Sequence, residues 1–522
     1  MPDITLIQAL QNPAIYNHSV SHFQVIETHI SWVLLTGDYA YKIKKPVDLG
    51  FLNFSSLAKR HHYCLQELAL NRRLAPQIYL DVIAIGGKPE SPVLGTEPII
   101  EYAVKMRQFS QSSRLDSLLA SHKLKAEHID RLADNIAAFH EQTEIADKDS
   151  DHGNPASVLE PVEENFQQIF TLLSGDGDIK RLETLKNWSL GQYAQLLPHI
   201  KQRKTNGFVR HCHGDLHLAN IALIDEKIVI FDCIEFNESL RWIDVISEIA
   251  FTTMDLIDRG HTDYAARMLD RYLQRSGDYA GLNLFQFYQA YRALVRAKVA
   301  IIRAHQPMLS KHEKQLALNQ YQEYITLAET LSYPHPQTLF ITYGVSGSGK
   351  TTLTQPLLEK FGMIRLRSDV ERKRLFGLPA EARTDSKDRH KIYSVDASQR
   401  TFQHLLVTAK KLCQSGFSVI IDATFLRQAH RQPFQALAKE LKLPFVILQF
   451  NAEEKQLHQW IKKRTQENKD ASDATIEVMQ QQLATVEPPS ENEADHLIRI
   501  NSGDGNAAEK LIAAVNDIQR KS

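Results

Sequence analysis

Three side chains suited to phosphate chemistry lie close together between residues 213 and 232. The run His213-Gly-Asp-Leu-His-Leu-Ala-Asn220 supplies a carboxylate and an amide, and Asp232 follows a short apolar strand-like run. Phosphoryl transfer needs a carboxylate that orients the attacking hydroxyl, and amide and carboxylate oxygens that hold magnesium against the nucleotide phosphates. We assign the first role to Asp215 and the second to Asn220 and Asp232. A simple turn followed by a strand-end cap is the alternative, which the occurrence of all three residues together disfavours.

A glycine-rich stretch beginning at residue 344 satisfies the pattern GxxxxGK[ST]. It follows the apolar run TLFITYGV and opens a helix-like segment that ends near Phe361. In such a loop the backbone N–H groups converge on phosphates, the lysine reaches the β and γ phosphates, and the threonine hydroxyl binds magnesium. A glycine-rich turn without nucleotide is the alternative, and the strand–loop–helix context argues against it. The predicted nucleotide-binding residues are Gly344, Ser346, Gly347, Ser348, Gly349, Lys350, Thr351 and Thr352, with Thr351 also a metal ligand.

Two aspartates follow this loop at the ends of predicted strands. Asp422 ends the β-branched run that starts at Phe417, as expected of a buried parallel strand with a terminal carboxylate that holds magnesium. Asp369 follows a shorter strand and precedes the basic residues 372–374. These basic side chains either stabilise phosphate charge or form a solvated helix face, and the sequence favours neither interpretation.

The segment around Asp215 resembles the catalytic loop of the aminoglycoside phosphotransferase and choline kinase group, which are relatives of the protein kinases. The resemblance implies that Asp215 is the catalytic base and that Asn220 and Asp232 bind magnesium. It also implies a brace for this loop at Asp244, for which a helix cap is an equally good interpretation. The stretch after the lysines at 42–44 departs from the antibiotic kinases, so aminoglycosides themselves are disfavoured as substrates.

The same resemblance implies an N-terminal hairpin lysine that pairs with a helix glutamate. Lys42 and Lys44 share one face of a predicted strand and Glu67 lies in the next helix, so either lysine is a candidate. A solvated strand edge is the alternative interpretation of the lysine pair. The strand-like segment 101–109, which includes Met106, is where such a fold places the hinge whose backbone groups bind adenine.

The C-terminal pattern resembles small P-loop kinases that phosphorylate hydroxyls, including polynucleotide 5′-kinases, zeta toxins and chloramphenicol phosphotransferases. By that resemblance Asp369 is the base that receives the hydroxyl proton. Asp422 holds magnesium through water. The charged helical region from His458 to Val486 resembles the lid of these kinases, in which Arg464 would cover the transferred phosphate.

The elements that position these residues divide the chain into four segments. Hydrophobic alternation predicts a hairpin within 23–44 and strands at 79–86 and 98–106, with a helix between them that Pro76 stops. Residues 1–109 are the N-lobe of a bilobal kinase-like fold, 110–332 its helical C-lobe, 333–337 a linker, and 338–522 a P-loop domain. The predicted fold class is α+β followed by α/β, the second with a parallel sheet flanked by helices.

Composition narrows the function classes further. The chain has 522 residues, 61 Lys plus Arg against 62 Asp plus Glu, and a net charge of -1, so no global field draws it to nucleic acid or membrane. Its 4 cysteines are scattered, as in reducing compartments, and no apolar run has the length of a membrane span. We therefore expect a cytoplasmic protein that does not act on membranes.

The two motif sets together predict a bifunctional enzyme that uses ATP and Mg²⁺ to phosphorylate hydroxyl groups of acceptors, which we expect to be small molecules. The sequence does not identify the acceptor, because fold and cofactor do not determine it. The tandem resembles bacterial proteins with an aminoglycoside phosphotransferase-like domain fused to a P-loop ATPase. Two alternatives stay open. One domain could be a regulatory nucleotide-binding module, or the C-terminal domain could phosphorylate 5′-hydroxyl ends of nucleic acid, which the lack of a basic-aromatic platform disfavours. Oligomeric state and communication between the domains are left open.

Overall fold

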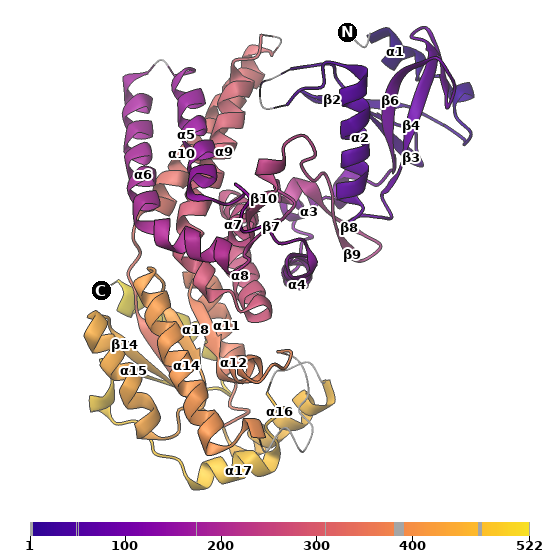
Figure 1. Cartoon of the computed structure of the whole chain (residues 1–522). Coiled ribbons are helices and arrows are strands. Elements are labelled where there is room, and N and C mark those ends of the chain that lie inside the picture. The colour runs from indigo at the N-terminus through magenta and orange to yellow at the C-terminus, as the bar shows by residue number, and fades with distance from the viewer. Residues whose placement is uncertain are drawn as a thin grey trace. The chain divides into compact units, whose positions relative to one another are not determined.

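The computed structural model describes residues 4–48, 50, 52–173, 175–307, 309–380, 391–467 and 472–520 (Figure 1). Contacts divide the chain into two compact units. The first comprises Met1–Arg131, Ala138–Glu164 and Ile200–Asp255, and the second comprises Leu132–Ala137, Asn165–His199 and Leu256–Ser522. No helix among the described residues is both long enough and apolar enough to cross a membrane.

The first unit begins with a six-stranded antiparallel sheet in the order β1-β2-β3-β6-β4-β5. Tyr41 and Ile43 of β3 point into a core shared with α1, so the alternate residues Lys42 and Lys44 face the other side, toward α2. Figure 1 shows α2 lying along the sheet. The elements are α1 (Ile4–Ala9), β1 (Gln24–Glu27), β2 (Ser31–Leu35), β3 (Tyr39–Lys44), α2 (Leu57–Asn71), β4 (Tyr79–Lys88), β5 (Ser91–Leu94) and β6 (Ile99–Arg107).

Two short antiparallel strand pairs, β7 with β10 and β8 with β9, frame the segment that carries Asp215. The loop after β7 and a single 3-10 turn place Asn220 directly before β8, and Asp232 follows β9. The remaining elements of this part of the chain are α3 (Leu115–Ala120), α4 (Ala126–Gln142), α5 (Pro155–Phe170), α6 (Asp176–Thr205), β7 (Val209–His211), β8 (Ile221–Ile224), β9 (Lys227–Ile230), β10 (Trp242–Asp244) and α7 (Val245–Asp258).

Directly before the P-loop sheet, the second unit contains α8 (Thr262–Ser276), α9 (Leu282–Ala304) and α10 (Lys311–Ser332). Most of α6 also belongs to this unit. Helices α9 and α10 pack against each other, and α8 packs against the helix that follows the glycine-rich loop. At that contact Arg365 Nη2 lies 2.9 Å from Asp270 Oδ2 of α8, and both side chains are buried. Arg365 Nη1 also donates to the carbonyl oxygen of Thr351 at 2.9 Å, so α8 is connected to the glycine-rich loop.

The C-terminal sheet has five parallel strands in the order β12-β13-β11-β14-β15. Side chains from β11, β13 and β14 form one core with α11 and α18, while α14 and α15 cover the other face (Figure 1). The elements are β11 (Leu339–Tyr343), α11 (Lys350–Phe361), β12 (Ile364–Arg367), α12 (Ser368–Leu375), α14 (Val395–Gln414), β13 (Val419–Asp422), α15 (Gln428–Leu441), β14 (Phe445–Asn451), α16 (Glu454–Glu467), α17 (Ile476–Ala484), β15 (His496–Asn501) and α18 (Ala507–Gln519).

The predicted fold class is confirmed: an antiparallel sheet with a helical lobe is followed by a parallel sheet flanked by helices. The helix after the hairpin ends at Asn71, a few residues earlier than Pro76 requires. The predicted linker, residues 333–337, joins α10 to β11 and belongs to the second unit. The domain boundaries at 109 and 338 stay predictions.

Candidate active sites

Lys42 lies between two acidic side chains in the first unit. Its Nζ is 2.8 Å from Glu67 Oε1 and 2.7 Å from Asp232 Oδ1. Burial alone would lower the pKa of Lys42, but the charges of Asp232 and Glu67 raise it well above its usual value. Strand β3, helix α2 and the segment after β9 therefore bring three of the predicted site residues together.

Lys44 occupies a different environment although it lies on the same face of β3. Its Nζ is 2.6 Å from Glu67 Oε2 and also contacts Glu235. The Lys44 side chain is 1% exposed and the Lys42 side chain 12%. Burial would raise the pKa of Glu67, but the two lysines lower it to about 2, so the carboxylate stays charged between them. Lys42 is thus the lysine that both reaches Asp232 and retains access to the site.

Asp215 and Asn220 are brought together by the loop after β7. Asn220 Nδ2 donates to the carbonyl oxygen of Asp215 at 3.0 Å and to its Oδ2 at 3.1 Å. His217 Nε2 lies 3.3 Å from the same carboxylate oxygen. Because the amide nitrogen of Asn220 is used inside the loop, its amide oxygen is the atom suited to bind a metal.

The backbone at Asp232 is held in an unusual conformation. Its φ is 63°, in the left-handed region that costs a non-glycine residue about 1 kcal/mol or more. Its N–H donates to the Tyr79 hydroxyl at 3.1 Å, and the next N–H, of Cys233, donates to Asn71 Oδ1 at 2.9 Å. These bonds fix the carboxylate beside Lys42. A carboxylate and an amide oxygen form a donor set that fits Mg²⁺, with Asp232 and Asn220 as the residues that would hold it.

Glu248 of α7 holds the backbone of the predicted catalytic loop. Its Oε1 accepts hydrogen bonds from the N–H groups of His213 at 2.9 Å and Gly214 at 2.7 Å, and its Oε2 lies 2.9 Å from His140 Nε2. Burial would raise the pKa of Glu248, but its bond with His140 keeps it below its usual value. No local pattern indicated this role for Glu248, and the resemblance implied it for Asp244.

Asp244 instead pairs with an arginine and caps a helix. Arg203 Nη2 donates to its Oδ1 at 2.7 Å, and the N–H of Ile246 in the first turn of α7 donates to the same oxygen at 2.9 Å. Both members of the ion pair are buried. The helix-cap interpretation of Asp244 is therefore the correct one.

Met106 lies inside β6, opposite Ala40 of β3 and Tyr79 of β4. Two residues beyond the strand, Phe109 packs edge to face against Phe231, with ring centroids 5.1 Å apart. The predicted hinge segment thus passes next to the residue that precedes Asp232. The adenine-binding role of Met106 stays a prediction.

The glycine-rich loop of the second unit has the geometry of a phosphate cradle. Gly344, Gly347 and Gly349 have φ angles of 150°, 85° and 83°. A Cβ at Gly344 would lie 2.6 Å from Ser348 Oγ and 2.8 Å from the carbonyl oxygen of Phe450. Ser348 Oγ is buried and, within the described ranges, has no hydrogen-bond partner. An unpaired hydroxyl in a loop that only glycines can form fits a loop that wraps phosphate oxygens.

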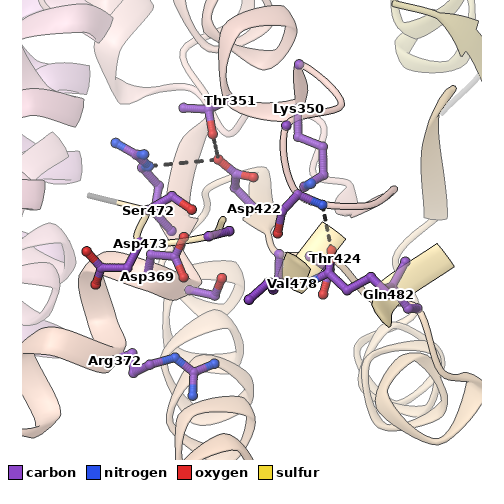
Figure 2. A pocket seen from close by; sticks show the side chains of 18 of the residues that line it. Lys350, Thr351, Asp369, Arg372, Asp422, Thr424, Ser472, Asp473, Val478 and Gln482 are labelled. Atoms are coloured by element: carbon purple, nitrogen blue, oxygen red, sulfur yellow. Dashed lines mark hydrogen bonds and ion pairs between the residues drawn. The ribbon is translucent and has the colours of Figure 1, made fainter. Parts of the chain in front are cut away.

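Lys350, Thr351 and Asp422 meet at the carboxyl edge of the parallel sheet. Lys350 Nζ donates to the carbonyl oxygens of Gly344 at 2.9 Å and Val345 at 2.8 Å. The Thr351 hydroxyl donates to Asp422 Oδ2 at 2.6 Å, as the dashed line in Figure 2 shows. Hydroxyl and carboxylate oxygens suit Mg²⁺, so these two residues would hold the ion beside the lysine.

A cavity of about 840 Å³ extends from this edge. Asp369 lines it, and Figure 2 shows the Asp369 carboxylate below Asp422 in the same space. Arg464 also lines the cavity and donates through Nη2 to the carbonyl oxygen of Ala474 at 2.7 Å. Of the predicted lid, residues 468–471 lie outside the described residues. The predicted residues of the C-terminal site that line the cavity are Ser346, Gly347, Gly349, Lys350, Thr351, Thr352, Asp369, Asp422 and Arg464.

Several cavity residues were not found from the sequence. Gln482 Oε1 accepts a hydrogen bond from the N–H of Ser346 at 2.8 Å, and Arg367 Nε lies 3.9 Å from Asp422 Oδ2. The Tyr393 hydroxyl lies 3.4 Å from Asp473 Oδ2. Asp473 and Gln482 lie in the predicted lid region, but the sequence assigned them no role. Arg367 ends β12 and Tyr393 precedes α14, and their approach to the cavity is not readable from spacing.

Comparison with known proteins agrees with this division of the chain. The model of a family described as an AAA domain matches residues 339–489. Proteins of Mycobacterium tuberculosis and Mycobacterium bovis, described as uncharacterized, are 31% identical over 407 residues, which is 77% of this chain and 78% of theirs. The chain belongs to the family of these mycobacterial proteins. Since the names of its members state no activity, membership assigns no substrate.

Solved structures resemble the two parts of this family member separately. An amicoumacin kinase in complex with AMP-PNP, Ca²⁺ and Ami is 12% identical with a TM-score of 0.39, covering 62% of this chain and 92% of the kinase. A gluconokinase from Sinorhizobium meliloti is 18% identical with a TM-score of 0.27, covering 36% of this chain and 97% of its own. At such TM-scores the function has to be argued from the residues of each site.

Proposed function

We propose that the protein is an ATP-dependent phosphotransferase with two sites, each of which transfers the γ-phosphate of ATP to a hydroxyl group of a small molecule. One observation carries the proposal. Two unrelated folds in one chain each place a lysine beside an acidic metal-binding candidate: Lys42 with Asp232, and Lys350 with the pair formed by Thr351 and Asp422. Each fold adds a second aspartate: Asp215 lies in the loop that carries Asn220, and Asp369 lines the cavity that Asp422 also lines.

In the N-terminal site, Lys42 would bind the nucleotide phosphates and Glu67 would hold the lysine in place. Asp232 and Asn220 would hold Mg²⁺, which neutralises charge on the phosphate oxygens. Asp215 would accept the acceptor's hydroxyl proton. The Asn220 and His217 contacts orient the Asp215 carboxylate toward that task. Met106 would contribute to adenine binding through its backbone.

In the C-terminal site, the backbone of residues 344–349 and Lys350 would bind the β and γ phosphates. Asp369 orients the acceptor hydroxyl and takes its proton while the hydroxyl oxygen forms a bond to the γ-phosphorus. The bond between that phosphorus and the bridging oxygen breaks, and its electron pair leaves with ADP. Arg464 would cover the transferred phosphate, and Thr351 with Asp422 would hold the Mg²⁺ that neutralises phosphate charge.

Nucleotide stoichiometry tests the proposal directly. Calorimetric titration of the intact protein with a non-hydrolysable ATP analogue and Mg²⁺ should give two equivalents. Lys42→Met and Lys350→Ala should each remove one equivalent and leave the other unchanged. A single equivalent that Lys350→Ala abolishes would overturn the two-site proposal.

A turnover assay separates catalysis from regulatory binding. Asp215→Asn and Asp369→Asn should each reduce ATP turnover and keep both nucleotide equivalents, since neither carboxylate is assigned to nucleotide binding. If one variant leaves turnover unchanged, the domain concerned is a nucleotide-binding module only. We place the reaction in the cytoplasm, because the four cysteines are buried and form no disulfide bonds, as is usual in reducing compartments.

A further inference from the structure

The three consecutive basic residues of α12, Arg372, Lys373 and Arg374, lie in three different environments. Lys373 lies 3.5 Å from Asp473, and Arg374 forms an ion pair with Glu371. Arg372 is only 7% exposed, yet within the described part of the chain it has no acidic partner. Its Nη1 donates to neutral acceptors, the carbonyl oxygen of Ile392 at 3.1 Å and Ser398 Oγ at 3.3 Å. The triplet is therefore not a solvated helix face.

The Nε–H group of Arg372 is buried and has no hydrogen-bond partner among the residues that the structure describes. Leaving a buried charged donor unpaired costs about 1–3 kcal/mol or more. What distinguishes Arg372 is its lack of a carboxylate partner: Arg365, whose Nε–H also has no partner among the described residues, pairs with Asp270 through Nη2, and Arg431 pairs with Glu493. Arg372 lines the 840 Å³ cavity, where a ligand could reach its guanidinium group.

Arg372 lies beside the candidate base. Asp369 and Arg372 are three residues apart on α12, so their side chains project from the same side of the helix. Both line the cavity, and in Figure 2 Asp369 lies between Asp422 and Arg372. The ring of Tyr393 lies against the guanidinium group, 4.9 Å from its central carbon, and supports it from one side. Phosphate-binding groups and Arg372 thus flank Asp369.

We propose that Arg372 binds an anionic group of the acceptor, so that the C-terminal site phosphorylates a small alcohol that also carries a carboxylate, phosphate or sulfate. This inference rests on the proposed kinase function of that site. A guanidinium group offers Nε–H and Nη–H as a fork that matches two oxygens of such an anion. The acceptor would then be held by its anion at Arg372 and would present its hydroxyl to Asp369.

A small acceptor fits these observations better than a nucleic acid. Nucleic acids are bound by rows of exposed cations and by aromatic side chains on an open surface. Arg372 is a buried guanidinium in a cavity that Arg367, Arg427 and Arg464 also line, and the volume of this cavity suits a small molecule.

Anion binding can be measured without knowing the acceptor. The full-length protein is saturated with a non-hydrolysable ATP analogue and Mg²⁺, and inorganic phosphate or sulfate is then titrated by calorimetry. One anion equivalent should bind to the wild type, and Arg372→Gln should weaken it about tenfold or more. Arg372→Lys should retain part of the affinity. Arg400→Gln removes a guanidinium group from the exposed side of α14, outside the cavity, and should change nothing.

The nucleotide equivalents serve as the internal reference. If they persist in Arg372→Gln while the anion equivalent is lost, the proposal is supported. Anion binding that is equal in wild type and Arg372→Gln overturns it, even when both nucleotides bind. If the wild type itself binds no nucleotide, the proposed kinase function is refuted. Failure of the kinase proposal and failure of the anion-binding proposal are therefore distinguishable.

Acceptor competition extends the test to catalysis. Glycerol, glycerate and glycerol 3-phosphate are compared as acceptors and as competitors of ATP turnover. The KM for glycerate and for glycerol 3-phosphate should each be at least about tenfold lower than the KM for glycerol. Arg372→Gln should remove that difference. A preference for glycerol, or transfer to a 5′-hydroxyl oligonucleotide and to neither small anion, would contradict the proposal.

Discussion

The Thr351 hydroxyl donates to Asp422 Oδ2 over 2.6 Å, and the two residues come from the first turn of α11 and the end of β13. Asp422→Asn removes the charge from this pair and keeps its size. We expect the Mg²⁺ concentration for half-maximal turnover of the C-terminal site to rise about tenfold or more. The measurement is a Mg²⁺ titration in the Asp215→Asn background. Asp504→Asn, a surface change at an exposed ion pair with Lys510, is the control.

Replacement of Lys42 by methionine should affect nucleotide binding, whereas replacement of Lys44 should affect stability. Lys42→Met should abolish nucleotide binding at the N-terminal site, while Lys44 keeps Glu67 paired and the fold stays stable. Lys44→Met removes a buried charge between Glu67 and Glu235 and should lower the free energy of unfolding by about 3–5 kcal/mol. Calorimetry and denaturant unfolding distinguish the two outcomes, and exchanged phenotypes would show that Lys44 is the nucleotide lysine.

Glu248→Ala should disturb the N-terminal site without removing any proposed ligand or base. The change leaves the buried N–H groups of His213 and Gly214 without an acceptor, at a cost of about 1–3 kcal/mol each. We expect ATP turnover of this site to fall more than nucleotide affinity does. Glu238→Ala, at a side chain that is 71% exposed, should leave both quantities unchanged.

His211 makes stability depend on pH. Burial, together with the charges of Arg73 and Arg241, lowers its pKa from 6.5 to about 4. The folded protein therefore favours neutral His211, and this contribution is complete above pH 6.5 and lost as the pH falls toward 4. Unfolding at a series of pH values should show a decline in that window, smaller in His211→Gln. His335→Gln, at an exposed site, should keep the wild-type decline.

Local patterns made much of the fold predictable. The hairpin that carries Lys42, the glycine-rich loop and the strand that ends at Asp422 each depend on neighbouring residues only. The choice between Lys42 and Lys44 was not readable, because it depends on Asp232 and Glu235, some 190 residues away in the chain. Periodicity cannot show which of two residues on one face a distant loop will reach.

The burial of charged side chains was the feature that the sequence predicted least well. Residues 372–374 look like a solvated run, yet Lys373 is fully buried and Arg372 nearly so, because α12 lies between the sheet and α14. Glu248 likewise stands in an ordinary amphipathic helix pattern. Its role follows from the packing of α7 against the loop after β7, which no local spacing encodes.

The ion pair between Asp270 and Arg365 determines where the chain can be shortened. A fragment that starts at residue 338 would contain the glycine-rich loop and all five parallel strands, but Arg365 would lose the carboxylate that neutralises it beneath that loop. Helix α8 therefore packs as part of the C-terminal unit, although the sequence analysis assigns it to the preceding domain. Any truncation meant to isolate the C-terminal activity should begin before Thr262.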